Sequence, residues 1–425
     1  MLTTGPRGTN DILPGEVEKW QHIEEAIRRI CGEYGYEEIR TPIFEHTELF
    51  QRGIGETTDI VEKEMYTFLD RGDRSITLRP EGTASTVRAF LEHKLYNQPQ
   101  PTKLFYIGPM FRYDRPQAGR FRQFHQFGVE VFGSDDPAVD AEVISLSMEY
   151  YRRLGLTALE LHINSIGCPE CRPVHREKLR EYLGPNLSRL CPHCQQRFER
   201  NPMRILDCKA ENCREASQGA PTTTSCLCPG CAEHFAGVKG YLASLEIDFI
   251  VDERLVRGLD YYTRTAFEIM APGIGAQSSI GGGGRYNGLI EECGGPPVPS
   301  IGFALGMERI LITLEKQGVN LPTGRDFDAF LATTGESTRP EAFRLLAQLR
   351  QAGVRADMDY LGRSLKAQMK FANKFGARFT VIVGEEELAR QVVVVKDMSD
   401  GSQQELGVAE LVDFVLNRRW ERIGG

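Results

Sequence analysis

The chain has 425 residues, of which 41% are hydrophobic and 26% charged, proportions typical of a globular protein with two or three domains. Its formal net charge of -8 argues against a nonspecific nucleic-acid coat protein, although a local basic surface could still bind one particular nucleic acid. No transmembrane segment is apparent, and residues 1–20 lack the basic and apolar regions of a secretory signal. We therefore expect a cytoplasmic protein, in which cysteines stay reduced.

The first predicted element is a helix over residues 16–34. Apolar side chains recur there at helical spacing and form one stripe, made of Val17, Trp20, Ile23, Ile27, Ile30 and Tyr34. Residues 36–45 are then predicted to form a strand that contains Pro42. Because proline cannot donate a ladder hydrogen bond, this strand should lie at a sheet edge, at a bulge or at a subunit contact.

A long antiparallel hairpin is predicted over residues 103–133, with strands at 103–114 and 122–133 joined by the loop 115–120. Strand alternation places polar residues and glycines on one face, namely Tyr106, Gly108, Met110, Arg112, Asp114, Phe124, Gln126, Gly128 and Glu130. The other face carries Phe127, Val129 and Val131 and should pack inward. Half-buried polar side chains need partners, so the first face either forms internal ion pairs or binds a ligand.

Three further segments carry polar side chains at the ends of predicted strands or helices. They are 79–83, with Arg79, Glu81 and Thr83; 257–262, with Arg257, Asp260, Tyr261 and Tyr262; and the helix start that holds Arg309. Taken singly, each could be an ordinary turn or a surface residue. The sequence has no P-loop and no complete G-x-G-x-x-G pattern. A bound nucleotide would therefore have its phosphates held by arginines and its base stacked on a phenylalanine.

Nine of the eleven cysteines lie between Cys168 and Cys231, which indicates an insertion. Six of them form three C-x-x-C pairs, Cys168 with Cys171, Cys191 with Cys194, and Cys228 with Cys231, while Cys208, Cys213 and Cys226 are left over. Paired C-x-x-C turns are typical of structural zinc sites, with one ion or two, but buried inert thiols are an equal alternative. After a polar linker at 318–326, alternating strands and helices predict a small α/β domain over residues 327–425.

Taken together, these segments resemble the histidyl-tRNA synthetase family of class II aminoacyl-tRNA synthetases. Residues 35–45 are similar to class motif 1, residues 110–133 to motif 2 and residues 302–311 to motif 3, while "LVRGLDYYT" and "SIGGGGRYNGLI" are similar to stretches specific to the histidine enzymes. The resemblance implies an α+β catalytic domain built on an antiparallel sheet, with an inserted Cys-rich domain and a C-terminal α/β anticodon-binding domain. The implied bounds are 1–166 and 248–322 for the catalytic domain, 167–247 for the insertion and 327–425 for the anticodon-binding domain.

The resemblance also implies roles for individual residues. Arg112 and Arg257 would be the catalytic residues, on opposite sides of the ATP α-phosphate. ATP would be bound by Arg112, Asp114, Arg120, Phe124 and Arg309, with the adenine between Arg309 and Phe124. Histidine would be bound by Glu81, Gly82, Thr83, Gln126, Glu130, Arg257, Tyr261 and Tyr262, with the imidazole facing Glu130 and Tyr262. Arg115 and Gln117 would face the tRNA acceptor end. Asp114 departs from the glutamate usual in motif 2.

The implied ligands and partners are ATP with Mg²⁺, L-histidine, tRNA(His) and a second copy of the chain. We expect the homodimer to form through the strand at "TPIFE" and the helix before it. We expect any zinc to lie far from the adenylate site. A non-catalytic, synthetase-like regulatory subunit of histidine biosynthesis is the alternative function, but such subunits typically lack the terminal domain and an intact "RGLDYY". A zinc deaminase is disfavoured because the H-x-E partner is missing.

Overall fold

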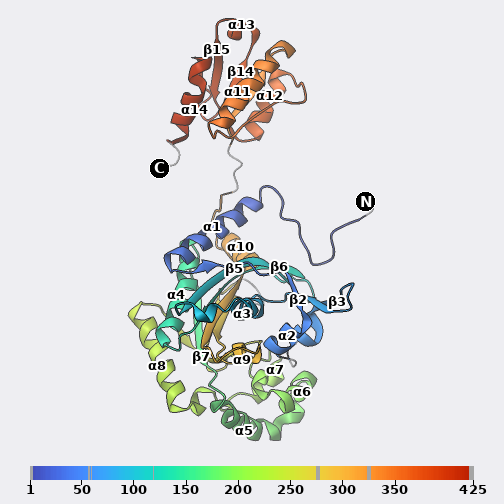
Figure 1. Cartoon of the computed structure of the whole chain (residues 1–425), viewed down its shortest axis with the longest axis vertical. Coiled ribbons are helices and arrows are strands. Elements are labelled where there is room, and N and C mark those ends of the chain that lie inside the picture. The colour runs from blue at the N-terminus through green and yellow to red at the C-terminus, as the bar shows by residue number, and fades with distance from the viewer. Residues whose placement is uncertain are drawn as a thin grey trace. The chain divides into compact units, whose positions relative to one another are not determined.

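The computed structural model describes residues 3–55, 58, 60–117, 119–273, 278–322 and 327–420. The chain divides into two compact units. The N-terminal unit comprises residues 1–13 and 19–321, and the C-terminal unit comprises residues 14–18 and 322–425. Each unit is described by itself below, and Figure 1 labels the elements of both.

An eight-stranded sheet forms the centre of the described N-terminal unit (Figure 1). Only the edge pairs, β1 with β5 and β7 with β8, are parallel, and the other neighbours are antiparallel. In spatial order the strands are β1 (Glu37–Glu38), β5 (Thr102–Phe111), β6 (Gln123–Phe132), β11 (Ser300–Gly306), β10 (Ser279–Arg285), β9 (Thr263–Met270), β7 (Glu160–Ser165) and β8 (Ile250–Val251).

One face of this sheet packs against helices and forms the main core. The helices are α1 (Val17–Glu33), α4 (Pro137–Arg153), α8 (Pro229–Ser244) and α10 (Met307–Lys316). Helices α2 (Thr47–Ile54), α3 (Thr83–Glu92) and α9 (Leu289–Glu292) contribute to smaller clusters. The predicted hairpin is confirmed as β5 and β6, with Tyr106 opposite Gly128 and Met110 opposite Phe124. Its inward face is also confirmed, because Phe127, Val129 and Val131 are buried in the main core.

The single strand predicted over residues 36–45 is wrong. The segment divides into β1 in the large sheet and β2 (Phe44–His46) in a separate sheet with β4 (Ser75–Leu78) and β3 (Tyr66–Leu69). Pro42 lies in the break, where no ladder donor is needed. The expected edge position is confirmed, because β1 and β2 are each the outer strand of their sheet.

The predicted first helix is confirmed as α1, but half of its apolar stripe packs inside the chain. Ile23, Ile27 and Ile30 are completely buried within the chain's own core. They are therefore not available to a second subunit. The large apolar side chains that remain exposed near the "TPIFE" segment are Ile43 and Phe44, together with Phe68 and Leu69 on β3.

The Cys-rich segment folds into short helices around a small core of its own. The helices are α5 (Cys171–Leu183), α6 (Pro192–Arg200), α7 (Glu211–Ala216) and the start of α8, with a 3₁₀ turn at Pro202–Ile205. Leu179, Leu183, Leu190 and Ile205 pack there beside Cys194 and Cys213. Figure 1 shows α5, α6 and α7 in green, gathered beyond one end of the large sheet.

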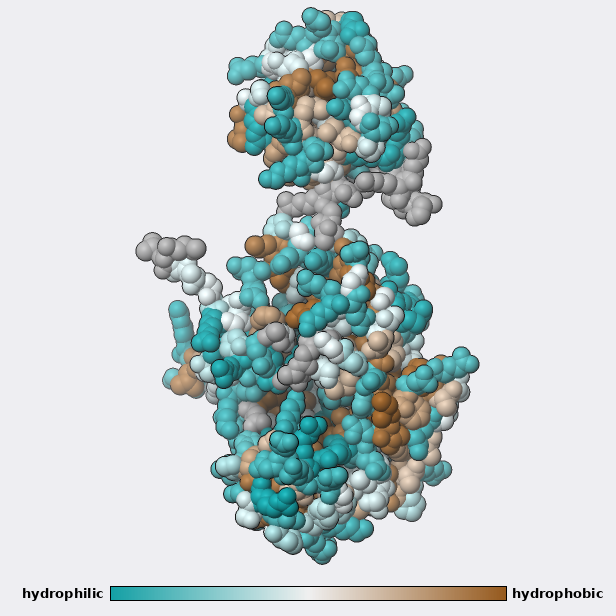
Figure 2. Space-filling view, turned by 180° about the vertical axis from the view of Figure 1, so that it is seen from behind, coloured by the Kyte–Doolittle hydropathy of each residue, from teal (hydrophilic) through white to brown (hydrophobic). Residues whose placement is uncertain are grey.

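The C-terminal unit confirms the predicted α/β domain. Its sheet has the order β13 (Ala356–Met358), β12 (Phe327–Thr333), β14 (Ala377–Val383), β15 (Val392–Asp397) and β16 (Gln403–Gly407). Helices α11 (Arg339–Gln351), α12 (Leu365–Lys374), α13 (Glu385–Ala389) and α14 (Leu411–Trp420) accompany the sheet. Figure 2 shows hydrophilic side chains over much of the viewed face of each unit, with hydrophobic patches among them. Among the described residues, no helix has both the length and the apolar character needed to cross a membrane.

Candidate active site

Two adjoining cavities open beside the polar face of the β5–β6 hairpin. The larger has a volume of about 330 Å³ and the smaller of about 200 Å³. They share a wall, made of Ile60, Arg112, Gln126, Arg257, Gly258, Gly282 and Ala304. Three of these shared residues, Arg112, Gln126 and Arg257, were predicted as site residues, so the fold brings distant motifs to one junction.

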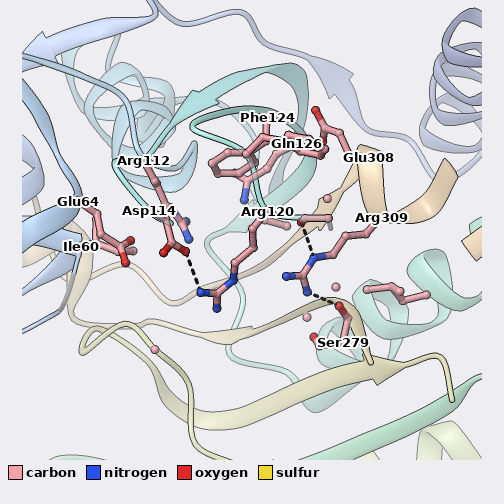
Figure 3. Close-up of a pocket in the computed structure, with 18 of the residues that line it drawn as sticks. Ile60, Glu64, Arg112, Asp114, Arg120, Phe124, Gln126, Ser279, Glu308 and Arg309 are labelled. Carbon is pink, nitrogen blue, oxygen red and sulfur yellow. Dashed lines mark hydrogen bonds and ion pairs between the residues drawn. The ribbon is translucent and has the colours of Figure 1, made fainter. Parts of the chain in front are cut away.

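The larger cavity is rich in positive charge (Figure 3). Its described lining includes five arginines, Arg112, Arg120, Arg204, Arg257 and Arg309, against three acids, Glu64, Asp114 and Glu308. Burial lowers the pKa of Arg309, and the neighbouring charge of Arg120 lowers it further. Burial also lowers the pKa of Arg112. An anion in this cavity would relieve both effects, because it compensates desolvated and mutually repelling cations.

Local contacts hold the arginines of the larger cavity in place. Arg120 Nη1 donates to Asp114 Oδ2 at 2.8 Å, and the Arg112 Nε donates to the Pro80 carbonyl at 2.8 Å. Arg309, near the start of α10, donates to the carbonyls of Gly119 and Ser279 at 3.1 and 2.6 Å. Figure 3 shows Arg120 and Arg309 reaching toward the same space as Phe124 and Gln126. The three predicted ATP-site arginines thus lie with Phe124 around one cavity.

Arg257 reaches the junction of the two cavities from the loop before β9. Its Nη1 donates to Glu268 Oε1 at 3.3 Å, and the same oxygen accepts from the Ser279 hydroxyl at 2.5 Å. A Cβ at Gly282 would lie 2.8 Å from Arg257 Nη1, so the absence of a side chain at this position of β10 leaves room for the guanidinium. Arg257 Nε and Gln126 Oε1 are buried without a hydrogen-bond partner among the described residues. Such atoms at a cavity wall favour a polar ligand.

The smaller cavity carries the residues predicted to bind an amino acid. Glu81, Thr83, Tyr261 and Tyr262 line it, with Gln126, Arg257 and Tyr286. The Glu81 carboxylate accepts the backbone N–H groups of Thr83 and Ala84 at 2.7 and 2.8 Å, at the start of α3. Burial raises the pKa of Glu81, although these two donors oppose the shift. The carboxylate is thereby fixed at the cavity wall and can still accept from a cation.

Glu130 lies behind the lining of the smaller cavity. Its oxygens accept from the hydroxyls of Thr83 at 2.7 Å, Tyr106 at 3.3 Å and Tyr286. Burial raises its pKa to about 8, and the hydroxyl donors oppose that rise. Gly302, which lines the cavity, leaves the space that the Glu130 carboxylate occupies, because a Cβ there would lie 2.0 Å from Oε2. Glu130 therefore acts on the cavity indirectly, because it orients the hydroxyls of Thr83 and Tyr286, which line it.

Other predicted residues lie outside the two linings. Gly82 accommodates the Tyr106 ring, since a Cβ there would be 2.3 Å from ring carbons. Arg115 and Gln117 are exposed in the hairpin loop, where the Gln117 backbone pairs with Arg120. Arg79 has a structural role, because its guanidinium donates to the backbone carbonyls of Pro109 and Thr41 at 2.9 and 3.1 Å.

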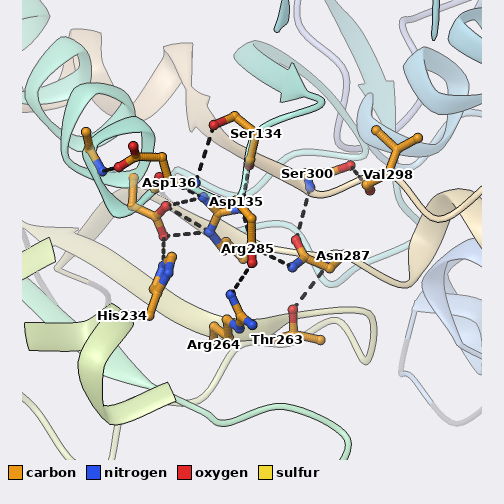
Figure 4. A network of polar contacts seen from close by, with 12 residues as sticks. Ser134, Asp135, Asp136, His234, Thr263, Arg264, Arg285, Asn287, Val298 and Ser300 are labelled. Carbon is orange, nitrogen blue, oxygen red and sulfur yellow. Dashed lines mark hydrogen bonds and ion pairs between the residues drawn. The ribbon is translucent and has the colours of Figure 1, made fainter. Parts of the chain in front are cut away.

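A buried ionic network fixes the end of strand β10 (Figure 4). Arg285 is completely buried, and its Nε donates to both carboxylate oxygens of Asp140 at 3.0 and 2.8 Å. Its remaining nitrogens donate to the carbonyls of Ser134 and Asp136 at 2.9 and 3.1 Å. His234 on α8 contacts Asp140 at 3.2 Å. Because Tyr286 follows Arg285 directly, the network also fixes the tyrosine that donates to Glu130.

Sequence reasoning missed several cavity residues. Ser279 and Tyr286 fall within or beside the quoted glycine-rich stretch, and Glu308 immediately precedes Arg309, so proximity to recognised motifs was their available signal. Glu308 binds the His125 backbone N–H at 2.8 Å and so joins α10 to β6. Arg204 comes from the Cys-rich insertion and had no such signal.

The cysteines gather into two groups of four. Cys168, Cys171, Cys228 and Cys231 form one, and Cys191, Cys194, Cys208 and Cys213 form the other, with the ligand atoms of each group within 4.8 Å of one another. Cys208 and Cys213, which the spacing left over, therefore complete the second group, while Cys226 belongs to neither. The insertion itself reaches the active site, because Arg204 lines the larger cavity and Asn201 Nδ2 donates to Asp260 Oδ1 at 3.1 Å.

An antiparallel sheet with an arginine-lined cavity over its hairpin is the catalytic fold of class II aminoacyl-tRNA synthetases, and this chain has it. A family model described as "Histidyl-tRNA synthetase" matches residues 8–169 and 223–310, and one described as "Anticodon binding domain" matches residues 328–418. The chain belongs to the histidyl-tRNA synthetase family. The unmatched interval between residues 169 and 223 lies within the Cys-rich insertion.

Curated relatives and solved structures agree with this assignment. The chain is 68% identical over 418 residues to the histidine--tRNA ligase of Desulforamulus reducens, covering 98% of this chain and all of the relative. It is 64% identical over 425 residues to that of Pelotomaculum thermopropionicum, covering 100% of this chain and 99% of the relative. The crystal structure of apo S. aureus histidyl-tRNA synthetase superposes with a TM-score of 0.84 at 44% identity, covering 97% of this chain and all of that one.

Proposed function

We propose that the chain is a histidine--tRNA ligase that activates L-histidine with ATP and transfers the histidyl group to the 3′ end of tRNA(His). The observation that supports this most is the pair of cavities joined at Arg112, Gln126 and Arg257. A triphosphate in the larger cavity and an amino acid in the smaller one would meet at that junction. The reacting carboxylate and phosphorus would be brought together there.

ATP would occupy the larger cavity. Phe124 and Arg309 would hold the adenine from its two faces, because an aromatic ring and a guanidinium both stack on a base. Asp114, with Arg120 paired to it, would contact the adenine edge, and the other arginines would bind the phosphates. Glu64 and Glu308 place carboxylate oxygens in the lining, the donor type that Mg²⁺ takes. When bound with ATP, Mg²⁺ would neutralise charge on the departing pyrophosphate.

L-Histidine would occupy the smaller cavity. Glu81, Thr83 and Gln126 would accept the α-ammonium, for which a fixed carboxylate and an unpartnered amide oxygen are suited. Tyr262 and Tyr286 would contact the imidazole, and Glu130 would set the direction of the Thr83 and Tyr286 hydroxyls. A pocket that hydrogen-bonds both ring nitrogens rejects apolar amino acids by about 10⁴-fold or more, because its own groups are left unpaired.

The chemical step needs no protein nucleophile. The histidine carboxylate would attack the α-phosphorus in line and displace pyrophosphate, with the histidyl-adenylate as product. Arg112 directly follows β5, and Arg257 lies in the loop before β9. At the shared wall their guanidinium groups would stabilise the charge that develops on the α-phosphoryl oxygens. Positioning and charge stabilisation therefore account for the acceleration.

Transfer to tRNA would use surfaces beyond the two cavities. The exposed Arg115 and Gln117 would face the acceptor end, and residues 327–425 would bind the anticodon.

A homodimer would form through the exposed Ile43, Phe44, Phe68 and Leu69, since apolar side chains gathered at sheet edges favour a partner. The protein would act in the cytoplasm. Structural Zn²⁺ would be held by Cys168, Cys171, Cys228 and Cys231, and by Cys191 and Cys194 with Cys208 and Cys213.

Aminoacylation of tRNA(His) with labelled histidine tests the proposal. We expect charging that requires ATP and the transcript and that stops when ATP is withheld. The alternative, a regulatory subunit that binds histidine without chemistry, predicts histidine binding but no charged tRNA. The intact Arg257–Tyr262 stretch and the C-terminal unit favour the enzyme.

A further inference from the structure

The second cysteine group has the geometry of a tetrathiolate metal site. Its four sulfurs lie within 4.8 Å of one another, with Cys191 and Cys208 Sγ 3.9 Å apart. Four sulfurs arranged tetrahedrally at about 2.3 Å from Zn²⁺ would be about 3.8 Å apart. A disulfide would need about 2.0 Å. The Cys191 backbone N–H also donates to Cys213 Sγ at 3.2 Å, a bond that orients a thiolate ligand.

The segment between Cys194 and Cys208 leads from this group to the active site. Arg204 Nη1 donates to the Gly258 carbonyl at 3.1 Å, and Asn201 Nδ2 donates to Asp260 Oδ1 at 3.1 Å. Both partners belong to the loop that carries Arg257. The segment thus contacts this loop at Gly258 and at Asp260, and Arg204 lies four residues before the ligand Cys208.

Arg204 itself is placed to bind an anion. It lines the larger cavity, and its buried Nε has no hydrogen-bond partner among the described residues. The core beneath it is small, with Ile205 and Leu206 packed against Cys194 and a few leucines. So small a core is a weak anchor for this half-buried arginine, and a metal ion would supply folding free energy at this point.

We propose that Cys191, Cys194, Cys208 and Cys213 bind Zn²⁺ and that this ion holds Arg204 against the catalytic loop, where its guanidinium binds the polyphosphate of ATP. The inference rests on the proposed function for the identity of the anion. It gives the insertion a role in adenylate formation. It also makes the second zinc ion a positioning element of the active site, with Arg204 as a further ATP-binding residue.

Elemental analysis of protein purified without chelator tests the metal site independently of activity. We expect two zinc ions per chain in the wild type and in the control Cys226→Ser, whose cysteine lies outside both groups, and one in Cys208→Ser. Hydrogen exchange should become faster in residues 201–208 of Cys208→Ser. Iron in place of zinc, less than one zinc in the wild type, or two zinc ions in Cys208→Ser would overturn the assignment.

Kinetics of histidine-dependent ATP–pyrophosphate exchange test the role of Arg204. Arg204→Ala should keep two zinc ions and raise the KM for ATP about 10- to 100-fold, the usual cost of a charged hydrogen bond, while changing the KM for histidine little. Arg189→Ala, a control on an exposed arginine of the insertion, should behave as wild type. An unchanged KM for ATP in Arg204→Ala overturns the proposal.

Zinc removal connects the two results. Releasing zinc from the wild type with a chelator should raise the KM for ATP as Arg204→Ala does, and adding zinc back should restore it. Because this uses the wild-type chain, it decides the question even if Cys208→Ser does not fold. Zinc loss that leaves the KM for ATP unchanged overturns the coupling. A wild type without any histidine-dependent exchange would instead refute the proposed function and leave the zinc analysis to stand on its own.

Discussion

Replacing Arg257 with alanine is the perturbation that most sharply separates chemistry from folding. Arg257 contributes one ion pair to the fold, to Glu268 at 3.3 Å, and both side chains are partly exposed, at 19% and 25%. Partly exposed pairs of this kind contribute about 1 kcal/mol or less to stability. Arg257→Ala should therefore remain folded, with a free energy of unfolding within about 1 kcal/mol of the wild type.

The kinetic effect should be much larger. Arg257 lines both cavities at their junction, and its Nε has no protein partner among the described residues, so this donor is available to the α-phosphoryl group. Removing one preorganised donor from a developing oxyanion typically costs about 100- to 1000-fold in rate, or roughly 2.7–4 kcal/mol. The expected rise in the activation free energy of adenylate formation is therefore several times larger than the expected drop in the free energy of unfolding.

The assay is ATP–pyrophosphate exchange with saturating histidine, measured beside urea unfolding. Arg264→Ala is the matched control, because Arg264 forms a comparable pair with Asp135 at 2.6 Å and lines neither cavity. We expect the control to exchange at close to the wild-type rate. Exchange by Arg257→Ala within about threefold of the wild type would refute a transition-state role.

Four further predictions follow from other parts of the molecule. Arg285→Met leaves Asp140 buried without its guanidinium and should lower the free energy of unfolding by about 3–5 kcal/mol; a loss below about 1 kcal/mol would contradict the network's role. Because burial raises the pKa of Glu130 from 4.5 to about 8, folding favours its protonated form. The wild type should therefore lose stability relative to Glu130→Gln as the pH rises through that window, and a pH-independent difference would be inconsistent with the shift. Deleting residues 323–425 should raise the KM for tRNA about tenfold or more while pyrophosphate exchange changes little, so normal charging by the truncated chain would speak against an anticodon-binding role. Light scattering should give twice the mass of one chain for the wild type and one chain mass for Phe44→Asp, and a monomeric wild type would rule the dimer out.

Local periodicity predicted the elements that carry the site. The alternation of residues 103–133 was enough to separate the polar face with Arg112 and Gln126 from the buried face with Phe127, because a strand's two faces follow from its sequence alone. Arg309 likewise fell on the first turn of a helix, as its position after a glycine-containing strand indicated.

The features that sequence reasoning missed depend on contacts between distant segments. Cys208 and Cys213 do not form a C-x-x-C pair, so only the folded insertion shows that they join Cys191 and Cys194. Arg204 reaches the ATP cavity because the insertion folds back onto the loop at Gly258, and nothing local to Arg204 encodes that approach. The stripe of α1 was recognised, but whether it packs on the same chain or on a partner is decided by the core that receives it.

ATP–pyrophosphate exchange measured separately with each standard amino acid tests the central claim most directly. The account predicts exchange with histidine, and at least about 10⁴-fold weaker exchange with every apolar amino acid, because the smaller cavity must hydrogen-bond the imidazole. Exchange stimulated by a different amino acid, or by none, would contradict it.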